Sequence, residues 1–121
     1  MNPDELPIFD VEFALNQFSG NQALLIRIVE KFIQQNEAFS EQLASNLQKE
    51  SSIETKRQIH TLKGVAANLG FKRLVATCHK IEPQASSSTQ IEDFRNLLDA
   101  IEIALFESRN YCNSATSSAH H

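Results

Sequence analysis

Few residues in this chain interrupt regular structure or cross-link it. Its three prolines stand at positions 3, 7 and 83, so no proline breaks a helix between residues 8 and 82. The two cysteines, Cys78 and Cys112, are too few for a disulfide framework, and there is no secretory signal or apolar run of 18 residues. We therefore expect long helices. The protein is expected in a reduced, cytoplasmic compartment, and Cys78 is expected to be a small core residue.

An excess of basic residues is also lacking. The net charge of −4 argues against a general nucleic-acid binder, and we expect no membrane contact by this segment. Six of the eleven basic residues nevertheless fall between positions 56 and 80: Lys56, Arg57, Lys63, Lys72, Arg73 and Lys80. This clustering predicts a local cationic field suited to an anionic group or an acidic partner, although an ordinary solvated helix face would show the same pattern.

The length of 121 residues, with 41% hydrophobic and 21% charged residues, fits one globular domain. We expect a tail or linker over residues 1–9, the folded domain over 10–112 and a disordered tail over 113–121. We assign no site role to His120 and His121, because a terminal pair of histidines is typical of an added tag.

Apolar residues recur every three or four positions along most of the chain. They predict a short helix from Asp10 to about Phe18 and a long one over 22–49, in which the polar residues 34–36 form either a bend or only surface. Further helices are expected over 52–69, 71–83 and from 89 onward, the first and last beginning at capping boxes Ser51–Glu54 and Thr89–Glu92. The predicted fold is all-α, an antiparallel up-and-down four-helix bundle with a short additional N-terminal helix.

One histidine, His60, is placed on the polar face of its predicted helix. At about 100° per residue, the apolar Ile59, Leu62, Val65, Ala66 and Leu69 gather on one side, whereas His60, Lys63, Gly64 and Ala67 gather roughly opposite. A glycine inside a helix costs about 1 kcal/mol relative to alanine. We infer that Gly64, one turn beyond His60, clears space for a large molecule to approach an exposed ring.

The imidazole of His60 has three plausible chemical uses, and each requires different neighbouring residues. Hydrolytic catalysis needs a nucleophile and a carboxylate in a cleft, which a convex helix face does not offer. A metal site needs ligands one turn away, but Arg57 and Gly64 stand there, so no metal ligands are predicted. A phosphorylated imidazole fits better, because Lys63 could offset its charge while Gly64 and Ala67 allow a donor to approach. With no glycine-rich nucleotide loop, a partner would supply the metal and the rest of the chemistry.

The segment His60-Thr61-Leu62-Lys63-Gly64, followed by Asn68-Leu69-Gly70, resembles the signature of histidine-containing phosphotransfer (HPt) domains of phosphorelays. The turn at 18–21 and the segment 78–82 resemble flanking positions of that family, so the resemblance covers about residues 10–112. Ile59 and Val65 replace the smaller residues that are common there, which bears on partner preference.

The resemblance implies a monomer in which His60 takes a phosphoryl group from the aspartate of one receiver domain and passes it to another. Lys63 would stabilise the phosphohistidine, and Gly64 and Ala67 would admit the receiver. From the clustering of basic residues, we also expect Lys56 and Arg57 to lie at the partner surface. The chain would need no cofactor or ATP site of its own, and Mg²⁺ would reside on the receiver.

Two alternative functions, each of a different class of protein, can be compared with this sequence. In the dimerisation domain of a histidine kinase, an acidic residue usually follows the histidine and a proline comes shortly after, where this chain has Thr61 and Gly64. A receiver-binding adaptor without transfer would not need both His60 and Lys63. His79 has no such motif and is expected to be an ordinary helix residue. A free-standing protein and a module of a hybrid sensor kinase both fit, and the acidic, proline-bearing start at 2–7 favours the module.

Overall fold

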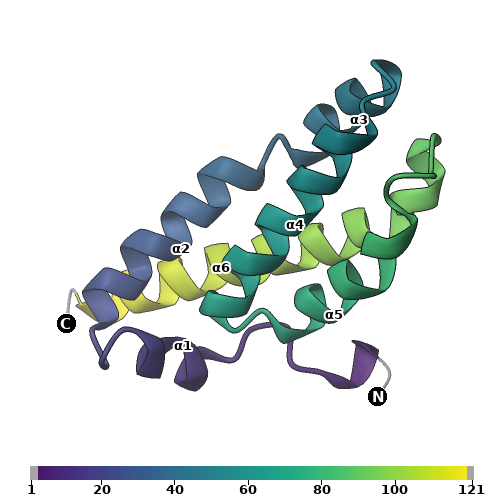
Figure 1. The fold of residues 1–121 in the computed structure, drawn as a ribbon. Coiled ribbons are helices and arrows are strands. Elements are labelled where there is room, and N and C mark those ends of the chain that lie inside the picture. The colour runs from purple at the N-terminus through teal and green to yellow at the C-terminus, as the bar shows by residue number, and fades with distance from the viewer. Residues whose placement is uncertain (1–2, 120–121) are drawn as a thin grey trace.

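Long helices lying side by side make up the structure, a computed structural model that describes residues 3–119 (Figure 1). Those residues contain no strand, which confirms the all-α prediction. The α-helices are α1 (Val11–Gln17), α2 (Gln22–Asn36), α3 (Phe39–Gln48), α4 (Ser52–Leu69), α5 (Lys72–Ile81) and α6 (Arg95–Ala119). Three short 3₁₀ turns, η1 (Pro3–Glu5), η2 (Glu82–Gln84) and η3 (Ile91–Phe94), complete the chain.

The helix that carries His60, α4, packs against α5 on one side and α3 on the other, with α1 crossing near its C-terminal end (Figure 1). Helix α6 packs against α2 and α5. The apolar stripes of these helices meet in one core, whose largest fully buried side chains include Phe32, Phe71 and Phe94. Burying one such side chain is worth about 1.5–3 kcal/mol, so the stripes fix which face each helix turns outward.

The predicted single helix over residues 22–49 is wrong, because the chain bends between α2 and α3. Ala38 leaves helical geometry at φ −100° and ψ 17°. The Asn36 side chain donates a hydrogen bond to the Phe32 carbonyl at 2.9 Å, and this side-chain bond competes with the regular helical pattern. The polar residues 34–36 therefore mark a bend, after which Phe39 re-enters the core.

Helix α4 begins and ends where its signals predict. The Ser51 hydroxyl accepts a hydrogen bond from the Glu54 amide, and Gly70 stops the helix at φ +77°. Gly70 cannot be replaced without strain, because an added Cβ would lie 2.6 Å from the Asp10 carbonyl oxygen. The turn that joins α4 to α5 is thus fixed by both backbone conformation and close packing.

The last helix differs from its prediction at both ends. It is preceded by η3, and the flanking residue is Gln90 rather than Thr89; the Gln90 amide donates to the Asp93 carboxylate at 3.4 Å. The helix continues to Ala119, so residues 113–119 are helical instead of forming the expected disordered tail. No glycine or proline interrupts residues 95–119, and half-buried Tyr111 and Cys112 still pack against the core. His120 and His121 lie outside the described residues.

The N-terminal segment, expected as a tail or linker over residues 1–9, is packed against α5 and the core from Asp4 onward. The Arg73 guanidinium donates to the carbonyls of Asp4 and Leu6. The Phe9 ring stacks on Phe71 with 4.6 Å between centroids. These contacts explain why the segment is ordered against the bundle. Among residues 3–119, no helix is long and apolar enough to span a membrane.

Candidate functional site

His60 lies in the middle of α4 on its exposed face, and its side chain is 70% exposed. The opposite face holds the helix in place, because Ile59, Leu62, Ala66 and Leu69 are buried. Val65, predicted with them, is only half-buried at the edge of the core. The prediction that the apolar stripe turns the imidazole outward is therefore confirmed.

A single carboxylate joins His60 to Lys63. Glu82 begins η2, directly after α5, and its Oε1 lies 2.8 Å from His60 Nδ1. The other oxygen, Oε2, accepts a hydrogen bond from the Lys63 ammonium. The Lys63 and Glu82 side chains are only 25% and 16% exposed, so they form a shielded pair beside the exposed ring.

The charge of Glu82 decides which ring nitrogen is available. Hydrogen bonds from Lys63 and then His60 hold the pKa of Glu82 below its ordinary value of 4.5, so this group is an anion at neutral pH. A carboxylate only accepts hydrogen bonds. His60 Nδ1 must then carry the hydrogen, and in the neutral ring the lone pair is on Nε2. The arrangement presents a nucleophilic nitrogen on an exposed ring.

Glu82 contacts both His60 and Lys63, and the sequence analysis did not include it in the candidate site. The signal lies in the turn, because His60 stands ten residues before Gly70 and Glu82 stands twelve after it. In a helical hairpin, residues at similar distances from the turn lie at similar heights. Recognising Gly70 as the turn therefore gave a way to pair the two residues before the structure was known.

On the C-terminal side of His60, the exposed face of α4 carries little side-chain bulk. An added Cβ at Gly64 would meet no atom within 4 Å beyond the adjoining residues and backbone of its own helix, so neither packing nor backbone conformation requires glycine there. Ala67, one turn further, is also exposed. The absence of side-chain bulk at these two positions therefore has no role within the described fold, and it leaves room for an approaching molecule.

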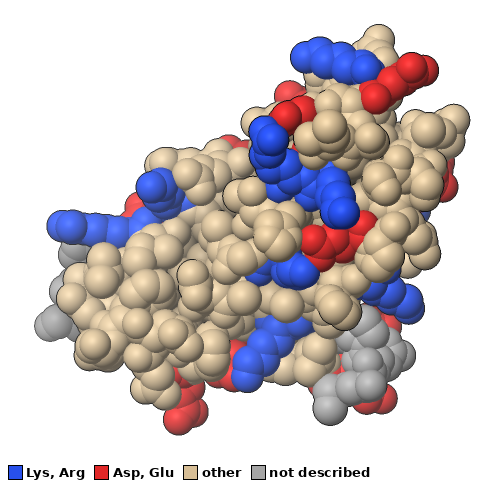
Figure 2. Space-filling view, viewed as in Figure 1, with Lys and Arg blue, Asp and Glu red and all other residues tan. Residues whose placement is uncertain are grey.

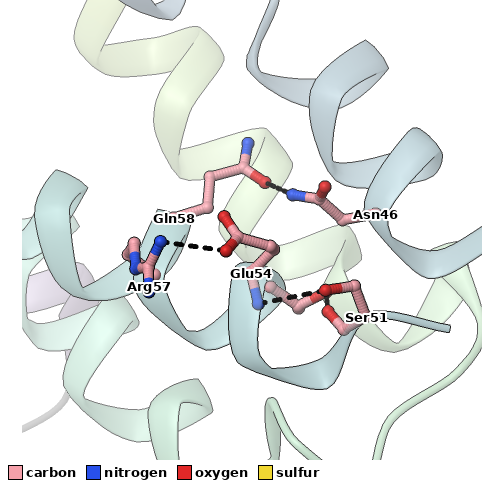
Figure 3. Close-up of polar contacts among 6 residues, drawn as sticks. Asn46, Ser51, Glu54, Arg57 and Gln58 are labelled. Carbon is pink, nitrogen blue, oxygen red and sulfur yellow. Dashed lines mark hydrogen bonds and ion pairs between the residues drawn. The ribbon is translucent and has the colours of Figure 1, made fainter. Parts of the chain in front are cut away.

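The six clustered basic residues do not form one field around His60. Lys56, Arg57 and Lys63 belong to α4, and Figure 2 shows Lys and Arg side chains gathered over this helix with acidic atoms among them. Arg57 is exposed and paired with Glu54 at 2.9 Å (Figure 3). The predicted cationic field is thus smaller and partly neutralised.

The other three basic residues serve different contacts. Lys72 pairs with Asp10 at 2.9 Å, and Arg73 binds the N-terminal carbonyls. Lys80 lines a separate groove with Asp99. Lys72 and Arg73 thus stabilise the N-terminal segment, and Lys80 lies at a groove on the α5–α6 side of the bundle.

The remaining candidate residues have structural environments. Cys78 is buried, and burial, followed by the nearby charge of Glu82, raises its pKa to about 12, so the thiol stays protonated in the core. His79 is exposed, and its side chain makes no hydrogen bond or ion pair with the part of the chain described. Within residues 3–119, no group of three or more His, Cys, Asp or Glu side chains could hold a metal ion.

Comparison with known proteins adds an independent observation. A family model described as the Hpt domain matches residues 27–110, which are 84 of the 121 residues and include His60, Lys63, Gly64 and Glu82. Comparisons with curated proteins and with solved structures gave no match. Since the family model covers more than half of the chain, this protein belongs to the Hpt domain family, the phosphotransfer domains of phosphorelays.

Proposed function

We propose that this chain relays a phosphoryl group between the aspartates of receiver domains through a phosphohistidine at His60. Hpt domains are phosphocarriers rather than catalytic enzymes, and they interact with receiver domains. The observation that carries the assignment is the hydrogen bond from His60 Nδ1 to Glu82. It leaves the lone pair on Nε2 of an exposed ring, where a receiver can reach it.

The transfer needs no nucleophile other than this nitrogen and the carboxylate of the second receiver. The Nε2 lone pair attacks the phosphorus of the aspartyl phosphate; the N–P bond forms, the P–O bond breaks, and its electron pair leaves with the aspartate carboxylate. The proton on Nδ1 stays in place, so the ring becomes cationic and Glu82 stabilises it. A carboxylate of the second receiver then attacks the phosphorus, and the N–P electron pair returns to Nε2.

Lys63 is given the role of neutralising the phosphoryl group. In the unmodified chain its ammonium is bound to Glu82, one turn from the ring. A flexible lysine can turn from this carboxylate to phosphoryl oxygens and act there as a point charge. Gly64 and Ala67 would then admit the receiver, and the exposed Lys56 and Arg57 would contact it.

The remaining features of the proposal follow the family. We assign the chain no cofactor of its own, with Mg²⁺ supplied by the receiver, and a cytoplasmic location. We also propose that the helices form a monomeric up-and-down four-helix bundle that binds neither nucleic acid nor membranes. Sedimentation equilibrium tests the monomer: a mass near 13.6 kDa supports it, whereas a stable dimer would favour the kinase dimerisation alternative.

Phosphoryl acceptance is tested by mixing the chain with several receiver domains, each shown beforehand to carry an aspartyl phosphate. We expect acid-labile, base-stable phosphate on the wild type and on His79→Gln, but none on His60→Gln. His79 is a matched control because it is another exposed histidine in a neighbouring helix. Equal labelling of His60→Gln, or no labelling of the wild type by any receiver, would overturn the proposal.

A further inference from the structure

A groove of about 470 Å³ lies between α4 and the segment where α2 bends into α3. Arg57 and Thr61 line it from the α4 side. Thr61 directly follows His60 in the sequence, and Arg57 stands about one helical turn before it. The groove is therefore continuous with the face that carries the imidazole. Nothing in the proposed transfer chemistry uses it.

The groove and Glu82 lie on opposite sides of the ring. At about 100° per residue, Arg57 and Thr61 are rotated about 60° and 100° from His60 in one sense, and Lys63 about 60° in the other. Lys63 binds Glu82, which follows α5. The α5 side of the ring is thus occupied by the Lys63–Glu82 pair, while the side toward α3 opens onto the groove.

The groove offers hydrogen-bonding groups without a net charge. Five carboxamides line it: Gln35, Asn36, Gln42, Asn46 and Gln58. Gln58 is held at both ends, since its oxygen accepts from Asn46 at 2.9 Å and its nitrogen donates to the Phe39 carbonyl at 3.1 Å. Figure 3 shows the Gln58–Asn46 contact beside the Arg57–Glu54 pair. The two charged lining residues thus neutralise each other, and the Gln58 and Asn46 carboxamides are pre-oriented.

Apolar side chains complete the lining. Phe39 and Leu62 are core residues, and half-buried Val65 lies beside them. A neutral surface with both donors and acceptors over an apolar base matches an extended peptide, whose backbone supplies N–H and C=O groups and whose side chain covers the base. It does not match a phosphate or another ion, because no unpaired charge lines it.

We propose that this groove binds an extended loop of the receiver domain and determines which receivers exchange phosphoryl groups with His60. The inference rests on the proposed function, because it takes the receiver as the partner. The loop would lie on the α3 side of the ring while the receiver's aspartate stands over Nε2. The side chain of Gln42, exposed and without a hydrogen bond to the described residues, is then free to bind the loop.

The test compares Gln42→Trp, which fills the groove, with Gln34→Trp, which adds the same bulk at an exposed position outside it. Transfer from a phosphorylated receiver is measured over a range of receiver concentrations, and labelling by the small donor phosphoramidate is measured in parallel. We expect Gln42→Trp to raise the half-saturating receiver concentration about tenfold, with the maximal rate and phosphoramidate labelling unchanged. Gln34→Trp should match the wild type in all three.

Equal half-saturating concentrations for the two variants would overturn the groove as a receiver site while leaving His60 as the acceptor. If phosphoramidate labels His60 but no receiver does, the proposed function fails, and this inference fails with it. An NMR titration of the wild type keeps the test independent of variant folding. The side-chain NH₂ signals of Gln42, Asn46 and Gln58 should shift on receiver addition, and unchanged signals during saturable binding would contradict the proposal.

Discussion

His60 and Glu82 are 22 residues apart in the chain, yet Nδ1 and Oε1 lie 2.8 Å from each other. The packing of α4 against α5 brings them together, and Lys63 holds the second carboxylate oxygen. The exposed His60 ring is thus oriented by Glu82, which Lys63 holds in place.

Replacing Glu82 should change the tautomer of His60. In Glu82→Ala, Nδ1 loses its acceptor, so both neutral tautomers become populated and phosphorylation by a receiver slows by about tenfold, the equivalent of about 1.4 kcal/mol. Glu82→Gln retains an acceptor oxygen and should slow transfer less. The ¹⁵N chemical shifts of the ring nitrogens report the tautomer, and a ring unchanged in Glu82→Ala would contradict the assignment.

The same carboxylate should make stability depend on pH. Its pKa is lowered in the folded chain, so its stabilising contribution is present above pH 4.5 and is lost as the pH falls from 4.5 through the lowered pKa. We expect Glu82→Gln to be less stable than the wild type at pH 7 by up to about 1 kcal/mol. Urea unfolding should show this difference shrinking as the pH falls below 4.5, and a difference that grew on acidification would contradict the prediction.

Gly64→Ala should stabilise the fold. The added Cβ enters open space, and alanine is favoured over glycine inside a helix by about 1 kcal/mol. Gly64→Trp should fold equally well but lose transfer from receivers while keeping phosphoramidate labelling. Urea unfolding and the two labelling rates check this prediction, and normal receiver transfer by the Trp variant would remove the argument for clearance at this position.

Gly70→Ala should destabilise the fold more than Gly20→Ala. Both glycines have positive φ, +77° and +75°, which costs an alanine about 1–2 kcal/mol. Only at Gly70 does the new Cβ also meet a backbone atom, the Asp10 carbonyl oxygen at 2.6 Å. We expect overpacking there to add about 1–3 kcal/mol, measured as the difference between the two variants in urea. Equal costs would show that the Asp10 backbone yields freely.

The parts of the fold that were predicted correctly depend on signals within one helix. Ser51 and Gly70 bound α4 through contacts with adjacent residues, and the buried Ile59 and Leu62 fix its outward face. The bend between α2 and α3 has a weaker local signal, because the same polar residues could lie on the surface of a straight helix. Only the packing of Phe39 distinguishes the two arrangements.

The candidate site likewise contains residues that signals within one helix predict and a residue that only packing between helices brings in. His60, Lys63 and Gly64 share one helix, so periodicity places them together. Glu82 reaches them from the end of the next helix, and the distribution of basic residues gave no indication of it. Lys72 and Arg73 are near His60 in sequence but serve the N-terminal segment, since their contacts depend on how that segment crosses the bundle.

The shared carboxylate also bears on how long a phosphoryl group would stay on His60. Glu82 is an anion next to the ring, so it repels the negative oxygens of a phosphohistidine even as it stabilises the ring's positive charge. Lys63 cannot fully neutralise both anions at once. Under the proposed function, the balance of charge that Glu82 sets among the ring, Lys63 and the phosphoryl group would determine how readily that group passes to the next receiver.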